Sequence, residues 1–561
     1  MKKFIINVYK NKNVRLLAFF FVAGGVVSVF TGQDNYYDLL NYHFYNAFAL
    51  LNGRYGTDII PAGMHTFLNP LADVPYYLML MHMTNFPRVV AFLMGIPYAV
   101  CAFFAVKIVF LVFKPAKGQD KYYALAAALL GVTGVMALGL CGASSGDLQT
   151  GMFILAAVYI ILRNKKILWL SGLLLGLGFG MKLTNGPIVA GFFIAALLYL
   201  FNKNWKEWLK NCFILGMTFL AGFFITNGFF MWRLWRDFQN PFFPFFNNIF
   251  KSSWFASQSA VDNVFIPQTL AQIISLPLTF GRSNTTTLAE VTRDLRLAFG
   301  TYFSFFVLFD IIIRKFKKGK DVYSGLINEK KLLFVAALWV VAYVFWLKMF
   351  AVMRYLVVPD FMVGVMLTAF FIRFINLKDK LLLFILITGI IVGYTVYPDW
   401  HNIKFRNKTV IMSDTKIKDG ALVLFFSRFS YLVPFSNPNA VYIGLNYNPI
   451  YYPDAFGQDF DQPYREGDSD LGTEIYKRHN FRPLIQKVIN AHNGPIYIVE
   501  PLSLYRLRPE QLAQYGLKIK QQKRECNLLK TNMYWPGVEP VICEVQKGDV
   551  TVDPSSQRTF K

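Results

Sequence analysis

The sequence alternates long apolar blocks with short polar gaps, and this pattern restricts the possible fold more than any other feature. The blocks are roughly 17–25 residues long, the length with which a helix crosses the hydrocarbon core of a bilayer. Hydrophobic residues make up 55% of the chain and charged residues 16%, whereas a soluble domain is about a quarter charged. We therefore predict an α-helical polytopic membrane protein. Its eleven expected spans are 14–31, 86–113, 122–140, 148–162, 167–181, 186–201, 211–231, 297–313, 331–347, 351–373 and 380–397.

The distribution of the basic residues explains the net charge of +24 without a nucleic-acid partner. Lysines and arginines gather in alternate short gaps, as with Lys114, Lys117 and Lys121, whereas the gap "CGASSGD" at 141–147 contains none. Cytoplasmic loops of membrane proteins carry this excess of positive charge. The pattern predicts a cytoplasmic N-terminus and, after eleven spans, an extracytoplasmic C-terminus.

Three segments expected outside the membrane are long, namely 32–85, 232–296 and the tail 398–561. We assign 1–397 to a transmembrane domain that includes the two loops, and 398–561 to an extracytoplasmic α/β domain. In the tail, "AVYIGLNY", "PIYIVEP" and "LKIKQQ" are typical of strands. "YKRHNFRPLIQKVINAHNG" and "RPEQLAQYG" are typical of helices that end at a glycine.

Two of the five cysteines, Cys526 and Cys543, lie in the tail on two apparent strands. An extracytoplasmic location permits a disulfide between them. The other three lie in or beside spans, where we expect ordinary packing. The sequence has no CxxC motif and no His/Cys spacing typical of a metal site.

The first outer loop opens with "TGQDNYYDLLNYHFYNAFALLNGR" at 31–54, which crowds ionisable and aromatic residues beside a span. On a helix, Asp34 and Asp38 would share one face, with His43 near the same side. A carboxylate partly desolvated at the membrane boundary has a raised pKa and is a better base. Alternatively, the tyrosines anchor a solvated helix at the interface, and the composition leaves both interpretations open. The rest of the loop adds Arg54, Asp58, His65, Asn69 and Asp73.

Four phrases along the chain carry a resemblance to a known superfamily. They are "DLLNYHFYNAFALLNGR", "TFLNPLADVPYY", "NPFFPFFNNIF" at 240–250 and "MRYLVVP" at 353–359. In this order, after a first span followed by a long outer loop, they resemble the GT-C superfamily of membrane glycosyltransferases, in a bacterial branch similar to the family 87 mannosyltransferases. The resemblance covers most of the membrane part and does not extend to the tail. It implies a location in the bacterial cytoplasmic (inner) membrane.

The resemblance implies an inverting hexosyltransferase that moves a sugar from a polyprenyl-phosphate carrier to an acceptor hydroxyl outside the membrane. The acceptor would be a glycan, glycolipid or protein of the cell envelope. In such enzymes an Asp of the first loop is the base. Asp38 is the first candidate for this role, and Asp34 is the second. His43 would orient the acceptor or the sugar. Arg54, His65 and Asn69 would make further polar contacts with the substrate.

The donor phosphate needs cations at the outer ends of spans. Arg354 and Lys348 flank one short outer turn, and Lys182 ends another span on the same side. Arg282 in the second outer loop is a further candidate. Snorkelling to the lipid headgroups would also explain such residues, but Arg suits a phosphate best. "NPFFPFF" is expected to contact either the lipid chain of the donor or the membrane. We predict no metal and no other cofactor.

Three other functions remain open from the sequence. A lipid-linked glycan transporter or flippase would need polar residues near the midplane of the membrane, and the expected spans are poor in charge. A ligase that joins a whole glycan to a lipid core would use similar loops. An envelope-assembly or binding protein would use the tail as its module and leave the polar first loop unexplained.

Overall fold

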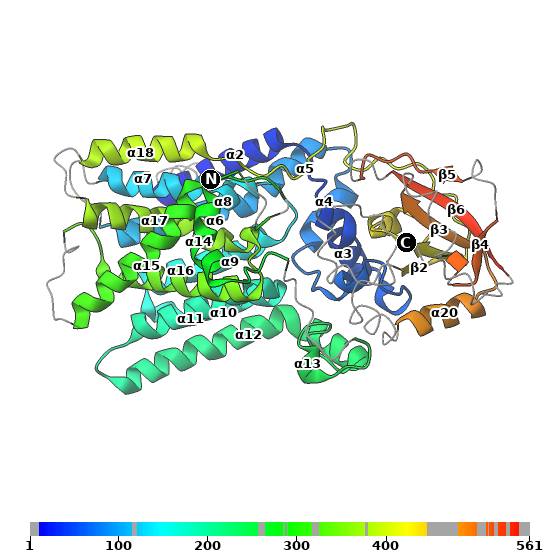
Figure 1. The fold of residues 1–561 in the computed structure, drawn as a ribbon, viewed down its shortest axis with the longest axis horizontal. Helices are drawn as coiled ribbons and strands as arrows, with labels where there is room; N and C mark the ends of the chain where they lie inside the picture. The colour runs from blue at the N-terminus through cyan, green and yellow to red at the C-terminus, as the bar shows by residue number, and fades with distance from the viewer. Residues whose placement is uncertain are drawn as a thin grey trace, which may run out of the picture. The chain divides into compact units, whose positions relative to one another are not determined.

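The computed structural model describes most of the 561 residues, and Figure 1 shows their fold. The described residues are 11–114, 121–255, 264–283, 287–288, 290–316, 325–375, 380–445, 481–501, 512–513, 515–520, 526–534 and 539–548.

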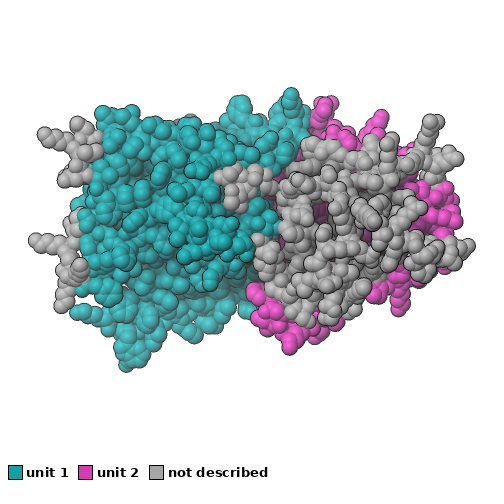
Figure 2. Space-filling model, in the orientation of Figure 1, with its two compact units in different colours: residues 1–34, 87–230, 261–405 teal, residues 35–86, 231–260, 406–561 magenta. Residues whose placement is uncertain are grey.

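The chain divides into two compact units, which Figure 2 colours separately. Unit 1 contains 1–34, 87–230 and 261–405. Unit 2 contains 35–86, 231–260 and 406–561. The sequence assigned the outer loops to the transmembrane domain, whereas the structure groups most of the first loop and part of the second with the C-terminal tail.

Unit 1 is helical. Among the described residues, seven helical segments are long and apolar enough to cross a membrane, which confirms a polytopic membrane protein. They are Lys12–Thr31 (α2), Pro87–Val112 (α5, Pro87–Met94, and α6, Ile96–Val112), Leu183–Leu200 (ending in α11, Gly186–Leu200), Trp205–Phe238 (α12), Leu295–Phe316 (α15), Glu329–Met349 (α16) and Met353–Phe374 (η7, Met353–Leu356, and α17, Val357–Phe374).

The other four expected spans coincide with shorter helices. They are α7 (Lys121–Val132) with α8 (Val135–Gly139), α9 (Asp147–Arg163), α10 (Leu168–Met181) and α18 (Lys380–Tyr394). The count of eleven spans therefore stays a prediction. The structure adds α14 (Leu270–Phe280), which the sequence analysis did not anticipate.

Helices α10 and α12 approach each other closely through glycines. A Cβ atom added at Gly176 would lie 2.0 Å from the carbonyl oxygen of Phe219. One added at Gly222 would lie 2.2 Å from the carbonyl oxygen of Leu173. Small residues at such crossings let membrane helices gain dispersion contacts between their backbones. This crossing therefore excludes larger side chains.

A fully buried ionic cluster joins helix ends within unit 1. The Arg296 guanidinium, with its side chain 0% exposed, donates to both oxygens of Asp294. Asp360, at the start of α17, accepts from the backbone N–H groups of Met136 and Ala137 at the start of α8. Buried charges are tolerated only when they are paired in this way. We assign these three charged residues a structural role.

Unit 2 contains a six-stranded mixed sheet (Figure 1). Its strands β1 (Leu422–Phe425) and β3 (Ile496–Pro501) are buried along their whole length, because both faces are covered. Strand β1 (Leu422–Phe425) pairs in parallel with β2 (Val441–Gly444) and β3 (Ile496–Pro501). Strand β6 (Pro540–Lys547) runs antiparallel to β3, β4 (Leu517–Ile519) and β5 (Asn527–Leu528). The structure thus has the small α/β region expected of the tail.

The predicted tail elements correspond to β2, α20 (Phe481–Ala491), β3 and β4. Part of the expected helix at 476–494 and most of that at 508–516 lie outside the described residues. The structure joins Cys526 to Cys543 on β6 by a disulfide. Strand β1, at the centre of the parallel strands, was missed because its short run "LVLF" lacks the alternation that marks a half-buried strand.

The first outer loop belongs to the same unit because it extends the sheet. Ile59 pairs in parallel with Ile443 at the edge strand β2, and its N–H donates to the carbonyl of Tyr442. The Asp58 carboxylate accepts from the N–H of Tyr442. An exposed strand edge would otherwise present unpaired backbone groups. This pairing explains why the loop groups with the tail rather than with the membrane helices.

We predict that Gly176→Leu destabilises the protein, because the added side chain must separate α10 from α12. Overpacking of this kind typically costs about 1–3 kcal/mol. Thermal unfolding of the purified protein in detergent should show a lower midpoint. Gly216→Leu, on α12 with no atom within 4 Å of the added Cβ, is the matched control. Equal midpoints for the two variants would contradict the proposed crossing.

Candidate functional site

A polar turn of unit 1 lies at 142–147, between α8 and α9. Two of its glycines have positive φ, 91° at Gly142 and 77° at Gly146, a conformation that other residues rarely adopt. Gly142 also lies against Ser28 of α2, where a Cβ would lie 2.4 Å from the serine Oγ. The glycines therefore fold a tight turn that places Ser144, Ser145 and Asp147 together at the start of α9.

Asp147 is the centre of this turn and pairs with two cations. Its side chain is only 3% exposed, and the Lys182 Nζ lies 2.5 Å from one carboxylate oxygen. The Arg354 Nε lies 3.9 Å from the other oxygen. Lys182 also donates to the backbone carbonyl of Ser145 at 2.6 Å. Two of the cations predicted to bind a phosphate are therefore brought together, although they lie far apart in the sequence.

Tyr355 adds an aromatic face to the same cluster. The Lys182 ammonium lies 5.5 Å and the Arg354 guanidinium 5.3 Å from the centre of its ring. Such contacts attract a cation to the ring without neutralising it. The two positive groups are thus held beside the same ring.

Asp34 is attached to the turn itself. Its Oδ2 accepts from the backbone N–H of Ser144 at 2.8 Å, and the residue is buried. Helix α2 ends at Thr31, Gly32 follows at a φ of 100°, and the N–H of Gln33 donates to the carbonyl of Ile403. The expectation that Asp34 and Asp38 share one helix face is therefore wrong, because the chain between them leaves the helix.

Two buried hydroxyls complete the turn. Ser144 and Ser145 are 4% and 2% exposed. Within the part of the chain that the structure describes, neither side-chain oxygen has a hydrogen-bond partner. Leaving a buried polar group unsatisfied costs about 1–3 kcal/mol, so such groups commonly serve a ligand or an ordered water. Two hydroxyls beside two cations fit an oxoanion such as a phosphate.

In the described residues, no group of three or more His, Cys, Asp or Glu side chains is arranged to hold a metal ion. The absence of a cofactor remains a prediction.

A second polar cluster lies in unit 2, around the π-helical turn η1 (Leu39–His43) and α3 (Phe44–Leu51). His43 Nδ1 lies 2.7 Å from a carboxylate oxygen of Asp73, and both side chains are buried. The His65 ring stacks on Tyr42 with centres 4.8 Å apart, and its Nδ1 lies 3.4 Å from the Asn41 amide. The predicted residues His43 and His65 are therefore gathered around η1, and π-helical turns are frequent at functional sites.

The remaining predicted residues have varied surroundings. Asp38 is buried at the start of η1 in unit 2. Asn69 accepts from the N–H of Leu71 in a turn. Arg282 is exposed after α14, and Lys348 is exposed in the last turn of α16. The cations of the Asp147 cluster are accordingly Lys182 and Arg354.

The contacts of Arg54 join parts of unit 2 to each other and do not favour a substrate-binding role. Its guanidinium donates to both oxygens of Asp58 and to the backbone carbonyls of Pro438 and Ala440. Burial raises the pKa of the Asp58 carboxyl, and the bond from Arg54 limits that rise. These contacts favour a role in attaching the first loop to the tail over the predicted contact with substrate.

Aromatic residues expected at the membrane surface or on lipid are partly core residues. Tyr45 is completely buried, and its hydroxyl donates to Asp58. Phe243 of "NPFFPFF" is also fully buried and packs against Phe67 and Phe481. In contrast, Phe246 of the same phrase is 44% exposed.

Sequence reasoning missed Asp147 and its two neighbouring serines. In the sequence, the gap "CGASSGD" differs from its neighbours only in that it contains no lysine or arginine. The feature that could have identified the turn is an acidic residue, Asp147, which follows Gly146 and begins an apolar block. Tyr355, beside the predicted Arg354, was also missed.

The chain matches no family model, no curated protein and no solved structure.

We predict that Arg54→Met destabilises unit 2, because it leaves the buried Asp58 carboxylate without its cation. Breaking a buried pair costs about 3–5 kcal/mol. Chemical unfolding in detergent, followed by limited proteolysis, measures the change. Arg236→Met is the matched control, because Arg236 pairs with Asp237 at the surface with its side chain 65% exposed, and exposed pairs contribute at most about 1 kcal/mol. Similar losses in both variants would argue against a structural role for Arg54.

Proposed function

We propose that the chain is a membrane glycosyltransferase. It takes a sugar from a polyprenyl-phosphate carrier and transfers it to an acceptor hydroxyl on the extracytoplasmic side of the membrane. The observation that supports this most strongly is the Asp147 cluster of unit 1, where Lys182, Arg354 and two buried serine hydroxyls lie together.

The location of the cluster fits a lipid-borne substrate. Asp34 follows α2, Asp147 begins α9, Lys182 follows α10, and Arg354 precedes α17. The alternating basic gaps assign all four helix ends to the outer side. A phosphate on a polyprenyl chain lies at the headgroup level, so groups at the ends of membrane helices can reach it.

The reaction needs one base and a stabilised leaving group. The acceptor oxygen attacks the anomeric carbon, the bond from that carbon to the phosphate oxygen breaks, and the electron pair leaves with the phosphate. Lys182 and Arg354 stabilise the charge that builds on the phosphate. A carboxylate takes the proton of the acceptor hydroxyl. Because the displacement is a single step, the anomeric configuration inverts.

We prefer Asp34 over Asp38 as the base. Asp34 is bonded to the turn that carries Asp147, so it belongs to the same unit as the phosphate cations. Asp147 has a positioning role, because one carboxylate between Lys182 and Arg354 reduces the repulsion that would otherwise separate them. The sequence alone favoured Asp38, whereas the contact of Asp34 with Ser144 supports the opposite order.

The main rival from another class is a flippase for lipid-linked glycans. A flippase would bind the same phosphate but would not break the bond to the sugar. The buried charges Asp294, Arg296 and Asp360 do not support a polar path through unit 1, because they lie at helix starts and bond to one another or to backbone N–H groups. Release of free carrier phosphate distinguishes the two functions.

We predict that Asp34→Asn lowers the transfer rate by about 10²–10⁴, the usual contribution of a general base. The amide oxygen can still accept from Ser144, so folding should survive. The assay uses purified protein, a panel of polyprenyl-phosphate hexoses, and detection of released carrier phosphate. Asp399→Asn, an exposed acid of unit 1, should retain the wild-type rate. If Asp38→Asn abolishes transfer and Asp34→Asn does not, Asp38 is the base.

We predict that Arg354→Lys keeps the positive charge but weakens donor binding, because lysine lacks the planar fork of arginine. A lost hydrogen bond to a charged group costs roughly 1.5–3 kcal/mol, a factor of about 10–100 in kcat/KM for the donor. KM for the acceptor should change little. Lys404→Gln, an exposed cation of unit 1, is the control. Wild-type kinetics in Arg354→Ala would remove this residue from the site.

A further inference from the structure

Helix α14 of unit 1 carries a stripe of exposed aliphatic side chains (Figure 1). The stripe consists of Leu270 (71% exposed), Ile273 (37%), Ile274 (61%) and Leu278 (49%). Residues that follow one another at intervals of three or four lie on one side of a helix. A contiguous apolar surface of this kind marks a contact with protein or with lipid.

The segment that contains α14 has no charged residue. From 264 to 280 it reads "VFIPQTLAQIISLPLTF". A helix whose outer side faces water carries charged and polar residues on that side. Charged residues are rare beside lipid, because they are costly to place there. The composition therefore favours lipid over water as the surroundings of the stripe.

Polar groups of α14 are bonded within the helix or to its neighbour. Thr269 and Gln272 form a capping box at the start of the helix. The hydroxyl of Ser275 donates to the backbone carbonyl of Gln272. The hydroxyl of Tyr302, on α15, donates to the backbone carbonyl of Ile274 at 2.7 Å. Backbone and side-chain groups in a membrane need such partners within the protein.

Helix α14 lies beside the first turns of α15, away from the basic last turn of that helix. The carbonyl of Phe280 accepts from the N–H of Asp294, which directly precedes α15. Tyr302 follows the first residue of α15, Leu295, by about 10 Å along the helix axis. The hydrocarbon core is about 30 Å thick, so both contacts fall within one leaflet. The charge pattern predicts that this is the outer leaflet.

The stripe continues an apolar surface that already belongs to the membrane. Helix α15 is one of the segments long and apolar enough to span a bilayer. Phe299, Phe306 and Phe309 of α15 are 42%, 57% and 64% exposed. Helix α14 itself has 11 residues and extends about 16 Å, which is too short to cross. It can therefore share the lipid around α15 without adding a span.

The end of α14 is attached to the turn that contains Arg354. The ring of Phe280 lies 6.3 Å from that of Trp346, near the end of α16. The carbonyl of Thr287, which follows α14 in the chain, accepts from the N–H of Met353 at the start of η7. Contacts between α14 and lipid therefore help to hold this turn at the level of the membrane surface.

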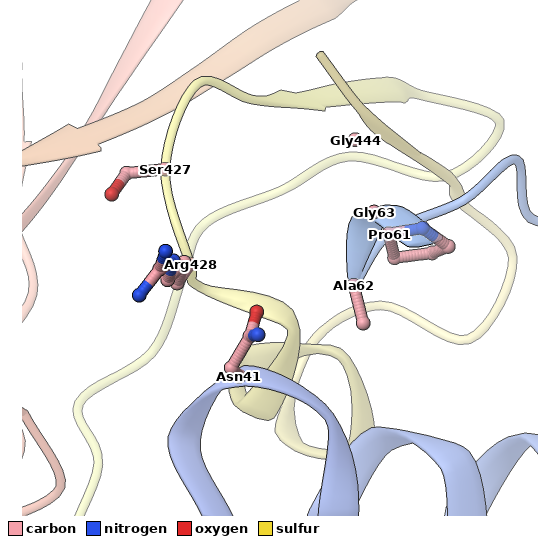
Figure 3. Close-up of a pocket in the computed structure, with 7 residues that line it drawn as sticks. All are labelled: Asn41, Pro61, Ala62, Gly63, Ser427, Arg428 and Gly444. Carbon is pink, nitrogen blue, oxygen red and sulfur yellow. The ribbon is translucent and has the colours of Figure 1, made fainter. Parts of the chain in front are cut away.

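The hollow at the ends of β1 and β2 in unit 2 is not an alternative site for lipid. Asn41 and Arg428 are among the residues that line it (Figure 3). It has room for about one water. A Cβ at Gly444 would lie 2.1 Å from the carbonyl oxygen of Ile60, so two of its walls nearly touch. A chain of methylene groups cannot enter this space.

We propose that α14 is a membrane helix that does not span, and that its aliphatic stripe contacts the acyl chains of the outer leaflet. Continuity with the exposed face of α15 and the lack of charge support bulk lipid as the occupant. The inference does not depend on glycosyl transfer, because it uses no residue of the Asp147 cluster as a ligand contact.

The test measures the accessibility of nitroxide labels on the full-length protein in phosphatidylcholine liposomes. Cys212, a partly exposed free cysteine, is first replaced by serine, and the other two free cysteines are buried. Leu270→Cys, Ile274→Cys and Leu278→Cys are then labelled one at a time. Molecular oxygen concentrates among acyl chains, whereas a polar nickel chelate stays in water. The ratio of the two accessibilities therefore reports whether each label lies in lipid.

The ratio at Ile274→Cys should be close to that at Phe306→Cys, the reference on α15. It should be lower at Gln272→Cys, on the opposite side of the same helix, and lowest at Lys404→Cys, an exposed position of unit 1. The proposal is wrong if Ile274→Cys and Leu278→Cys give the ratio of Lys404→Cys. It is also wrong if added polyprenyl phosphate removes oxygen from these labels, because the occupant is then a carrier chain. Should one stripe variant fail to fold, the others decide.

Discussion

The bilayer imposes the constraint on which the rest of unit 1 depends, because a backbone in hydrocarbon must satisfy its own hydrogen bonds. The membrane segments are therefore helices, and polar chemistry is displaced to their ends. Asp34, Asp147, Lys182 and Arg354 all lie there, as does the structural group Asp294, Arg296 and Asp360. The two groups differ in composition: the structural group bonds internally and to backbone N–H groups, whereas the turn of Asp147 places two buried serine hydroxyls beside two cations.

Hydropathy and charge predicted the membrane class and the helices, because both follow directly from the cost of placing charge and backbone in lipid. Each expected span coincides with a helix, although only seven helical segments in the described residues have the length to cross a membrane. The α/β tail was also predictable, since β3 and α20 follow ordinary strand and helix patterns. Strand β1 was not, because "LVLF" is too short to show a period.

Part of the candidate site was predictable from the sequence, but its arrangement was not. Lys182 and Arg354 could be selected because cations on the outer side break the expected charge pattern. Asp147 could not, since its importance comes from contacts with residues more than thirty positions away. The expectation that Asp34 and Asp38 share one helix face did not take account of Gly32, whose positive φ turns the chain out of α2 and leaves Asp34 against Ser144. The hydrophobic periodicity of the sequence does not reveal how one such glycine changes the direction of the chain.

The pairing of the first loop with the edge of β2 also sets an order of assembly. Arg54 and Pro438 are bonded across 384 residues of sequence. Chains that emerge from the ribosome fold their N-terminal parts first, yet residues 35–86 lack the strands that cover them until the last quarter of the chain is made. During synthesis, side chains of the loop that are buried in the folded protein, such as Asp58 and Tyr45, are therefore exposed to water until these strands are made. Contacts of such long range slow folding, so unit 2 is the last part of the protein to close.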